Sequence, residues 1–231
     1  MNVIKYLFVF SLFAFTQSSP TKVKKEIKLA VDDLVFKAIP DYAQDLENLY
    51  KRLGFNVEIK RCPLTRCLLL FKQGKISALS LQIGTLNEAL ENAIRIEVPI
   101  TEKIKLYPYK LTGKKIENVN EATHIIIAGN QSHIKFLKKY KIKNFIKAKN
   151  QNQINRNIDR GRADIFIAPD LVVKAFKNPN KYQISDKRFD ENQFFHFIHP
   201  SIKEYKKKIE EELLKLKKKH AFKYKFNSLT D

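Results

Sequence analysis

Apolar residues along this chain recur with the periods of helices and of strands, and residues 62 to 84 show both most clearly. Gly74 divides this stretch and stands where a residue in the left-handed region ends a helix at little cost. Residues 76 to 83 are almost continuously apolar or small, as in a strand buried on both faces. Before the glycine, the i, i+3, i+4, i+7 spacing of one helical face falls on Leu64, Cys67, Leu68 and Phe71.

The same order of elements recurs between Gln153 and Asp170. A predicted helix carries Ile154 and Ile158, Gly161 ends it, and an apolar strand follows. Two such units in a chain of 231 residues predict two similar α/β lobes with a cleft between them.

Around residues 62 to 84, the first unit has the order β-α-β-α-β, which requires a parallel sheet with right-handed crossovers. The predicted strands cover residues 26–31, 55–60 and 76–83, and the helices cover 41–53 and 63–73, with a loop at 34–40. A polar helical stretch at 85–92 follows. Two apolar segments come next, which we interpret as the crossing between lobes and an outer strand: 93–100 and 104–111.

The second unit repeats the element order of the first after a surface loop at 113–121. Its strands are expected at 124–128, 145–149 and 163–168; one helix bears Ile134, Leu137 and Tyr140, and the next runs from Asn150 to Gly161. A short helix at 171–177 and a strand at 193–198 follow, and the strand can return to the first lobe. Ser201 is expected to cap a final helix, whose apolar face consists of Ile202, Tyr205, Ile209, Leu213 and Leu216.

The first 18 residues predict a secretory signal peptide. Lys5 gives a positive start, residues 7–15 are apolar, and the chain turns small and polar towards Pro20. The apolar run is short for a membrane span, although an uncleaved anchor is the alternative. We expect cleavage near residues 16–19 and a secreted protein.

The formal net charge of +20 comes mostly from lysine. The lysines are spread along the chain rather than clustered with aromatic residues, which favours a solvated basic surface and no nucleic-acid partner. Affinity for an anionic membrane or cell wall is the alternative, and the lysine-bearing final helix could lie on such a surface.

The two cysteines, Cys62 and Cys67, are a natural disulfide pair in an oxidising compartment. Five residues apart on one helix they would not face each other. Cys62 must therefore lie before the first turn, with Pro63 at the first helical position. A redox-active pair is the alternative, but the usual two-residue spacing is absent.

Motifs of catalytic or metal sites are absent from the sequence, which has no G-x-S-x-G elbow and no H-E-x-x-H. His196 and His199 lie three apart in a strand-like run, so they would point to opposite faces, which disfavours shared metal ligation. We therefore expect no enzyme activity, no metal and no cofactor.

Several short motifs occur in a fixed order. KLAVDD at 28–33 is followed by a helix ending in LGF, and residues 63–78 read P-x-x-R-x-L, then five residues, then G-K-I-x-A. Gly161, Arg162 and Asp164 form G-R-x-D, although Asp164 itself is expected to have a structural role. With the signal peptide, this order resembles the bacterial extracellular solute-binding proteins of the amino-acid-binding type, which are periplasmic binding proteins of type II.

The resemblance implies two α/β lobes, each a mostly parallel sheet flanked by helices, joined by two hinge crossovers. The first lobe would comprise residues 19–104 and 193–231, and the second residues 105–192. Ligands of open parallel sheets lie outside the carboxyl ends of the strands, where helix N termini suit anions. The candidate ligand-binding residues are accordingly Asp32, Asp33, Phe36, Arg66, Gln82, Thr85, Gly129, Asn130, Ser132 and Asp170.

Two departures from the family weaken the expectation of an α-amino-acid ligand. The arginine that clamps the ligand carboxylate in this family is missing from residues 85–90, and Arg66 or Arg95 would have to substitute. Asp170 lies near the place of the family's ammonium-binding aspartate, but Pro169 shifts its register.

The function that the resemblance implies is binding of a small polar solute, either amino-acid-like or another metabolite, by a periplasmic monomer. The expected partner is an inner-membrane ABC permease that imports the solute. One alternative is a basic envelope-associated interaction or sensor protein of the same fold without transport, and another is a secreted enzyme.

Overall fold

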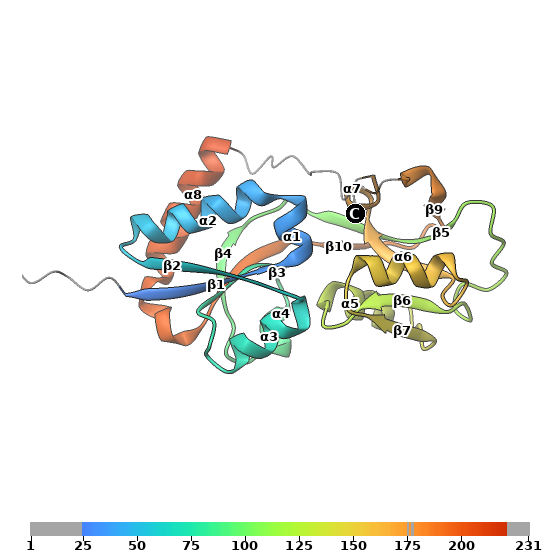
Figure 1. Ribbon diagram of the computed structural model, residues 1–231, viewed down its shortest axis with the longest axis horizontal. Helices are drawn as coiled ribbons and strands as arrows, with labels where there is room; N and C mark the ends of the chain where they lie inside the picture. Colours follow the sequence, from blue (N-terminus) through green and yellow to red (C-terminus); the bar gives the residue numbers. More distant parts are fainter. Residues whose placement is uncertain (1–24, 175, 177, 221–231) are drawn as a thin grey trace, which may run out of the picture.

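A computed structural model describes residues 25–174, 176 and 178–220, so the predicted signal peptide lies outside the described residues. The chain forms two mixed sheets side by side along the long axis of the molecule, each flanked by helices (Figure 1). The chain crosses from the first sheet to the second between β4 and β5 and returns between β10 and β11.

The first sheet has the strand order β2-β1-β3-β11-β4. Its strands are β1 (Glu26–Asp32), β2 (Asn56–Cys62), β3 (Ala78–Ile83), β4 (Ile94–Pro99) and β11 (Phe194–Ile198). β1 pairs in parallel with β2 and β3, as the β-α-β-α-β pattern predicted. β11 lies antiparallel between β3 and β4, so the chain does return to the first sheet here.

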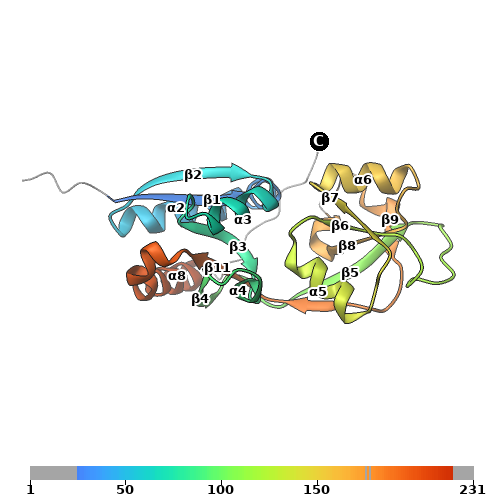
Figure 2. The same ribbon diagram turned by 90° about the horizontal axis from the view of Figure 1, so that it is seen from below.

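Helices cover both faces of the first sheet (Figures 1 and 2). They are α1 (Asp33–Ala38), α2 (Pro40–Arg52), α3 (Leu64–Lys72), α4 (Leu86–Ala89) and α8 (Lys206–His220). Alternate side chains of β1 reach the two faces: Leu29 joins the core under α2 and α8, whereas Ala30 packs with Cys67 and Phe71 of α3.

The second sheet has the order β10-β5-β8-β6-β7, with β9 also paired to β5. Its strands are β5 (Ile104–Leu111), β6 (His124–Ile127), β7 (Phe145–Ala148), β8 (Ile165–Pro169), β9 (Tyr182–Ile184) and β10 (Asp190–Asn192). β6 runs parallel to β7 and β8, which confirms the repeated unit.

The helices of the second sheet are α5 (Gln131–Lys139), α6 (Gln151–Asp159), α7 (Asp170–Lys174) and a 3-10 turn at Pro179–Lys181. The apolar side chains of α5 and α6 join two different cores, one on each face of the sheet. Phe136 of α5 packs with Ile126, and Ile154 of α6 packs with Ile125.

The sequence expectations for residues 34–40, 85–92 and 104–111 are wrong. Helix α1 occupies the predicted loop at 34–40, because Val35 and Phe36 pack against the first core. Only Leu86–Ala89 of the polar stretch at 85–92 is helical. β5 is not an outer strand, since β8 lies on one side of it and the short, unpredicted β9 and β10 lie on the other.

The final helix is built into the first lobe. A 3-10 turn (Pro200–Tyr205) precedes α8, and the His199 side chain caps it by accepting the N–H of Ser201; Ser201 is therefore not the cap. The apolar side chains of this segment are buried in the first core and are not available to a membrane: Ile202, Ile209, Leu213 and Leu216. Across the described ranges, no helix has the length and apolar character needed to span a membrane.

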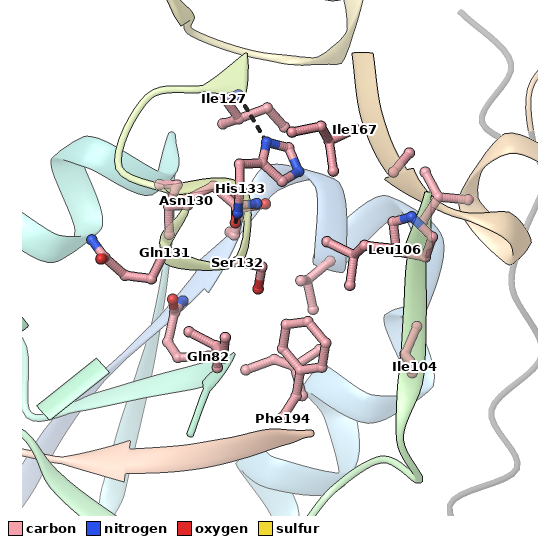
Figure 3. A pocket seen from close by; sticks show the side chains of 18 of the residues that line it. Gln82, Ile104, Leu106, Ile127, Asn130, Gln131, Ser132, His133, Ile167 and Phe194 are labelled. Carbon is pink, nitrogen blue, oxygen red and sulfur yellow. Dashed lines mark hydrogen bonds between the residues drawn. The ribbon is translucent and has the colours of Figure 1, made fainter. Parts of the chain in front are cut away.

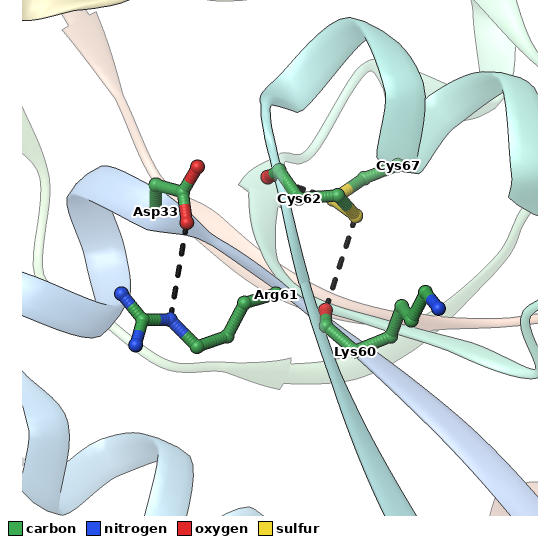
Figure 4. The surroundings of a disulfide bond; sticks show 5 residues. All are labelled: Asp33, Lys60, Arg61, Cys62 and Cys67. Carbon is green, nitrogen blue, oxygen red and sulfur yellow. Dashed lines mark hydrogen bonds and ion pairs between the residues drawn. A yellow bond between two sulfur atoms is a disulfide. The ribbon is translucent and has the colours of Figure 1, made fainter.

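The predicted disulfide between Cys62 and Cys67 is present (Figure 4). Cys62 is the last residue of β2 and Cys67 lies in α3, with their Cα atoms 5.6 Å apart. Pro63 is the N-cap of α3 and not its first helical residue, so the bridge closes around the turn from strand to helix.

A buried hydrogen-bonded chain ties α2 to the strands of the first sheet. His196 Nδ1 lies 3.3 Å from the carbonyl of Ser80 and can only donate to it. Its Nε2, 2.6 Å from the Tyr50 hydroxyl, then accepts from that hydroxyl. His196 is therefore a neutral core residue.

Replacing both Cys62 and Cys67 with serine is expected to lower the free energy of unfolding by about 2 kcal/mol, because a short loop is freed in the unfolded chain. Urea unfolding of the double variant, beside oxidised and reduced wild type, measures the effect. The reduced wild type should match the variant. Equal stability of all three forms would contradict this account.

The free energy of unfolding of His196→Gln is expected to fall less than that of wild type as the pH is lowered. Burial lowers the pKa of His196 to about 4, from 6.5, so the unfolded chain takes up the proton first as pH falls. The contribution of neutral His196 to the free energy of unfolding is complete above about pH 6.5 and is lost as the pH falls towards about 4. Between about pH 7.5 and about pH 5 the loss amounts to about 2 kcal/mol.

Urea unfolding at both pH values measures this difference. Burial lowers the pKa of His133 as well, so the variant keeps part of the acid sensitivity. Parallel pH dependence in wild type and variant would show that His196 does not contribute.

Candidate functional site

A cavity of about 150 Å³ lies between the two lobes at the carboxyl ends of parallel strands from both sheets. Asp32 of β1 and Gln82 of β3 line it from the first lobe. Ile127 of β6 and Pro169 of β8 line it from the second. This is the edge at which ligands of open α/β sheets bind.

Most of the cavity wall is hydrocarbon. Branched and aromatic side chains from elements of both lobes meet there, including Val35, Leu81, Leu106, Ile127, Ile167 and Phe194. Such a wall stabilises the apolar part of a small molecule by removing it from water.

The polar corner of the cavity is the start of α5 (Figure 3). Asn130 is the N-cap of this helix, and its side chain accepts the N–H of His133 at 3.2 Å. The backbone N–H groups of Gln131 and Ser132 make no hydrogen bond within the described residues. These free donors stand at the positive end of the helix dipole, where an anionic or carbonyl oxygen is favoured.

Ser132 and His133 bring side chains to the same corner. They are 2% and 4% exposed, and both line the cavity. His133 Nδ1 lies 3.1 Å from the backbone nitrogen of Ile127 and accepts its hydrogen. Burial lowers the pKa of His133 to about 3, so the ring is neutral at physiological pH.

Charged side chains are scarce in this cavity. Of the described residues that line it, Asp32 is the one carboxylate, and none is a lysine or arginine. A ligand carboxylate would therefore be held by neutral donors at α5 and not by an arginine clamp.

The structure brings together four of the residues that the sequence predicted: Asp32, Gln82, Asn130 and Ser132 all line the cavity. Gly129 lies in the turn just before α5. Its φ of 80° is in the left-handed region, and a Cβ there would lie 3.4 Å from Leu68 of α3. The glycine therefore allows the left-handed backbone of this turn, which lies against α3 of the first lobe.

The other predicted site residues do not line this cavity. Asp33 pairs with Arg61 at 3.9 Å (Figure 4), and the Arg61 guanidinium lies over the ring of Phe36. Thr85 precedes α4 without capping it, and Arg66 is exposed on α3.

Arg95, the other substitute considered for the family's arginine, and Asp170, which lies near the place of its aspartate, are also paired elsewhere. Arg95 donates to the carbonyl of Gly84 and pairs with Glu97. Asp170 pairs with Lys174 at 2.6 Å and accepts a hydrogen bond from the Tyr109 hydroxyl. Asp164, expected to be structural, accepts the N–H of Thr123 and pairs with Lys114, which confirms that role.

Sequence reasoning missed His133, the polar residues Gln131 and Gln151, and the apolar wall. His133 follows Ser132 directly, so its place in the first turn of a predicted helix was a usable signal. The sequence gives no signal for the apolar wall, because its residues have the same pattern as residues of a hydrophobic core.

The start of α3 links the two lobes. The Thr65 hydroxyl donates to the carbonyl of Ala128, which follows β6, at 3.0 Å. Leu64 belongs to the core cluster of the second lobe, together with Ile127 and Val172. The disulfide therefore links β2 covalently to the start of α3, the segment of the first lobe that packs on the second.

No family model matches this chain, and no curated protein matches it in sequence. Solved structures match it in shape. A putative L-cystine ABC transporter from Listeria monocytogenes has a TM-score of 0.72 at 16% identity, over 86% of this chain and 93% of its own.

Two further solved structures are similar. The arginine-bound form of truncated ArgBP from T. maritima has a TM-score of 0.65 at 14% identity, over 83% of this chain and 96% of its own. The GluR0 ligand-binding core from Nostoc punctiforme, in complex with L-glutamate, has a TM-score of 0.67 at 15% identity, over 86% of this chain and 95% of its own. These likenesses confirm the two-lobed periplasmic-binding-protein fold that the sequence resemblance implied.

Proposed function

We propose that this protein binds one small solute between its lobes and delivers it to an inner-membrane ABC permease. The observation that carries the proposal is the cavity itself: both sheets line it, and free donors at the start of α5 face it. A signal peptide at residues 1–18 would place the protein in the periplasm, where an oxidised Cys62–Cys67 pair is stable.

The solved structures support a small ligand with a polar group. They are named for L-cystine transport, arginine binding and a complex with L-glutamate. In this chain the N–H groups of Gln131 and Ser132, with the Ser132 hydroxyl, would hold a carboxylate or carbonyl oxygen of the solute.

We further propose that the two crossovers act as hinges and that ligand binding favours the closed arrangement. The contact of Thr65 with Ala128 and the packing of Leu64 in the second core are interactions that an open arrangement would lose. The lobes would comprise residues 19–104 with 193–231, and 105–192. A monomer suffices, because one chain supplies both walls of the cavity.

A thermal-shift screen of amino acids, organic acids and polyamines tests the binding proposal on protein secreted to the periplasm of an expressing bacterium. A solute at about a hundred times its Kd is expected to stabilise the fold by about 2.7 kcal/mol, a rise in Tm of about 5–10 °C. A flat response to all classes would count against a solute-binding function.

Ser132→Ala and Arg66→Ala make a matched pair for any solute that the screen identifies. Ser132→Ala should weaken its binding by about three- to tenfold, because one donor to the ligand is lost. Arg66→Ala should leave binding unchanged, since Arg66 is exposed on α3. Weaker binding by Arg66→Ala, with unchanged binding by Ser132→Ala, would show that Arg66 and not Ser132 contacts the solute.

Thr65→Val is expected to shift the lobes towards the open arrangement. It removes the hydrogen bond to Ala128, worth about 1 kcal/mol or about fivefold in a two-state equilibrium. Small-angle scattering without added solute should show a larger radius of gyration than wild type. Thr112→Val, which removes a hydrogen bond within the second lobe, is the control and should leave the radius of gyration unchanged. An unchanged radius in Thr65→Val as well would show that the contact with Ala128 does not hold the lobes together.

A further inference from the structure

The hydrogen-bond partner of His133 fixes which ring nitrogen carries the proton. Nδ1 accepts the backbone N–H of Ile127 at 3.1 Å, so Nδ1 has no hydrogen of its own. A neutral imidazole has one N–H, which must therefore be on Nε2. Protonation of both nitrogens would cost the bond to Ile127 inside a fully buried site.

The Nε2–H group has no acceptor within the described part of the chain. The ring is 4% exposed and lines the cavity, and Figure 3 shows the second nitrogen on the side of the ring away from the bonded Ile127. Among the described residues, the buried side-chain atoms that lack a partner are His124 Nε2 and Ser185 Oγ; His133 Nε2 is not one of them, so it is accessible from the cavity. The cavity therefore presents a donor of fixed position, which an acceptor oxygen of water or of a ligand can satisfy.

Around this donor the cavity is apolar. Ile127 and Ile167 lie beside His133, Leu106 lines the same lobe's side of the cavity, and Phe194 of β11 lines it from the first lobe (Figure 3). The cavity volume of about 150 Å³ suits a skeleton the size of a branched amino acid. The free N–H groups of Gln131 and Ser132 offer a place for one carboxylate.

We propose that His133 is a specificity-determining residue, and that the ligand is a small monocarboxylate with a branched or aromatic body and an acceptor oxygen beside the carboxylate, in the manner of a 2-oxo acid. This inference rests on the proposed function. An α-amino acid of the same skeleton places an ammonium group where the acceptor is needed. Ammonium is a donor only, so the Nε2–H of His133 would stay unpaired and face a like group.

Asp32 is the other titratable side chain that lines the cavity, and it comes from the opposite lobe. If Asp32 paired with a ligand ammonium, the protein would prefer the α-amino acid to the 2-oxo acid. The ratio of the two affinities, 2-oxo acid over α-amino acid, is therefore above one for the proposal and below one for this alternative.

Ketoisocaproate and L-leucine provide the test, because they share a skeleton and differ in a carbonyl oxygen against an ammonium group. Calorimetric titration of the wild-type protein is expected to give ketoisocaproate at least about tenfold tighter binding. Equal or tighter binding of L-leucine overturns the proposal. Binding of neither probe, with a positive response to other solutes in the screen, also overturns it and leaves the proposed function standing.

His133→Leu should remove the preference and bring the two affinities to within about twofold, since no donor then distinguishes carbonyl from ammonium. A purely structural His133 would lower both affinities and leave their ratio unchanged. Ser132→Ala is the matched control and should keep the preference.

Nitrogen NMR of the wild-type protein gives a readout that does not depend on the folding of a variant. With histidine labelled at the ring nitrogens, we expect a proton on Nε2 of His133, none on Nδ1, and a shift of the Nε2–H signal on addition of ketoisocaproate. A proton on Nδ1, or an Nε2–H signal unmoved at saturation, would overturn the proposal.

Discussion

Parallel strands of one sheet all end at the same edge, and this constraint sets the position of every polar group in the cavity. Right-handed crossovers return each helix so that its N terminus follows a strand end. In this protein β1 and β3 deliver Asp32 and Gln82 to one side, and the turn after β6 delivers Asn130 and Ser132 to the other. The two sheets present these edges to each other, and the cavity lies where they meet.

The balance of polar and apolar surface inside the cavity limits what can bind. Neutral donors gather at the start of α5, and the rest of the wall is mostly hydrocarbon. None of the described lining residues is a lysine or arginine, so a ligand with several negative charges would find no cation in the cavity to offset its loss of solvation. A helix N terminus can hold one carboxylate, because its free N–H groups and dipole act together.

Helix α3 connects the covalent, packing and cavity features of the molecule. Its start is bridged to β2 by Cys62–Cys67, and it reaches the second lobe through Thr65 and Leu64. Gly129 suits the turn beside α3, since its φ of 80° is a conformation that larger residues adopt only with strain. The disulfide therefore fixes the part of the first lobe that packs against the second.

Local patterns in the sequence predicted the periodic elements, the repeated α/β unit, the disulfide and the place of Asp32, Gln82, Asn130 and Ser132 at the edge between the lobes. These depend on local spacing and on the shared edge of parallel strands, both of which are visible in a single chain. Long-range contacts in the folded molecule pair Asp170 and Arg95 elsewhere and build α8 into the core. Long-range contacts also place β9 and β10 beside β5 and direct the donor of His133 to the cavity. The partner of a side chain and the pairing of a three-residue strand depend on residues far away in the chain, and no local pattern encodes those contacts.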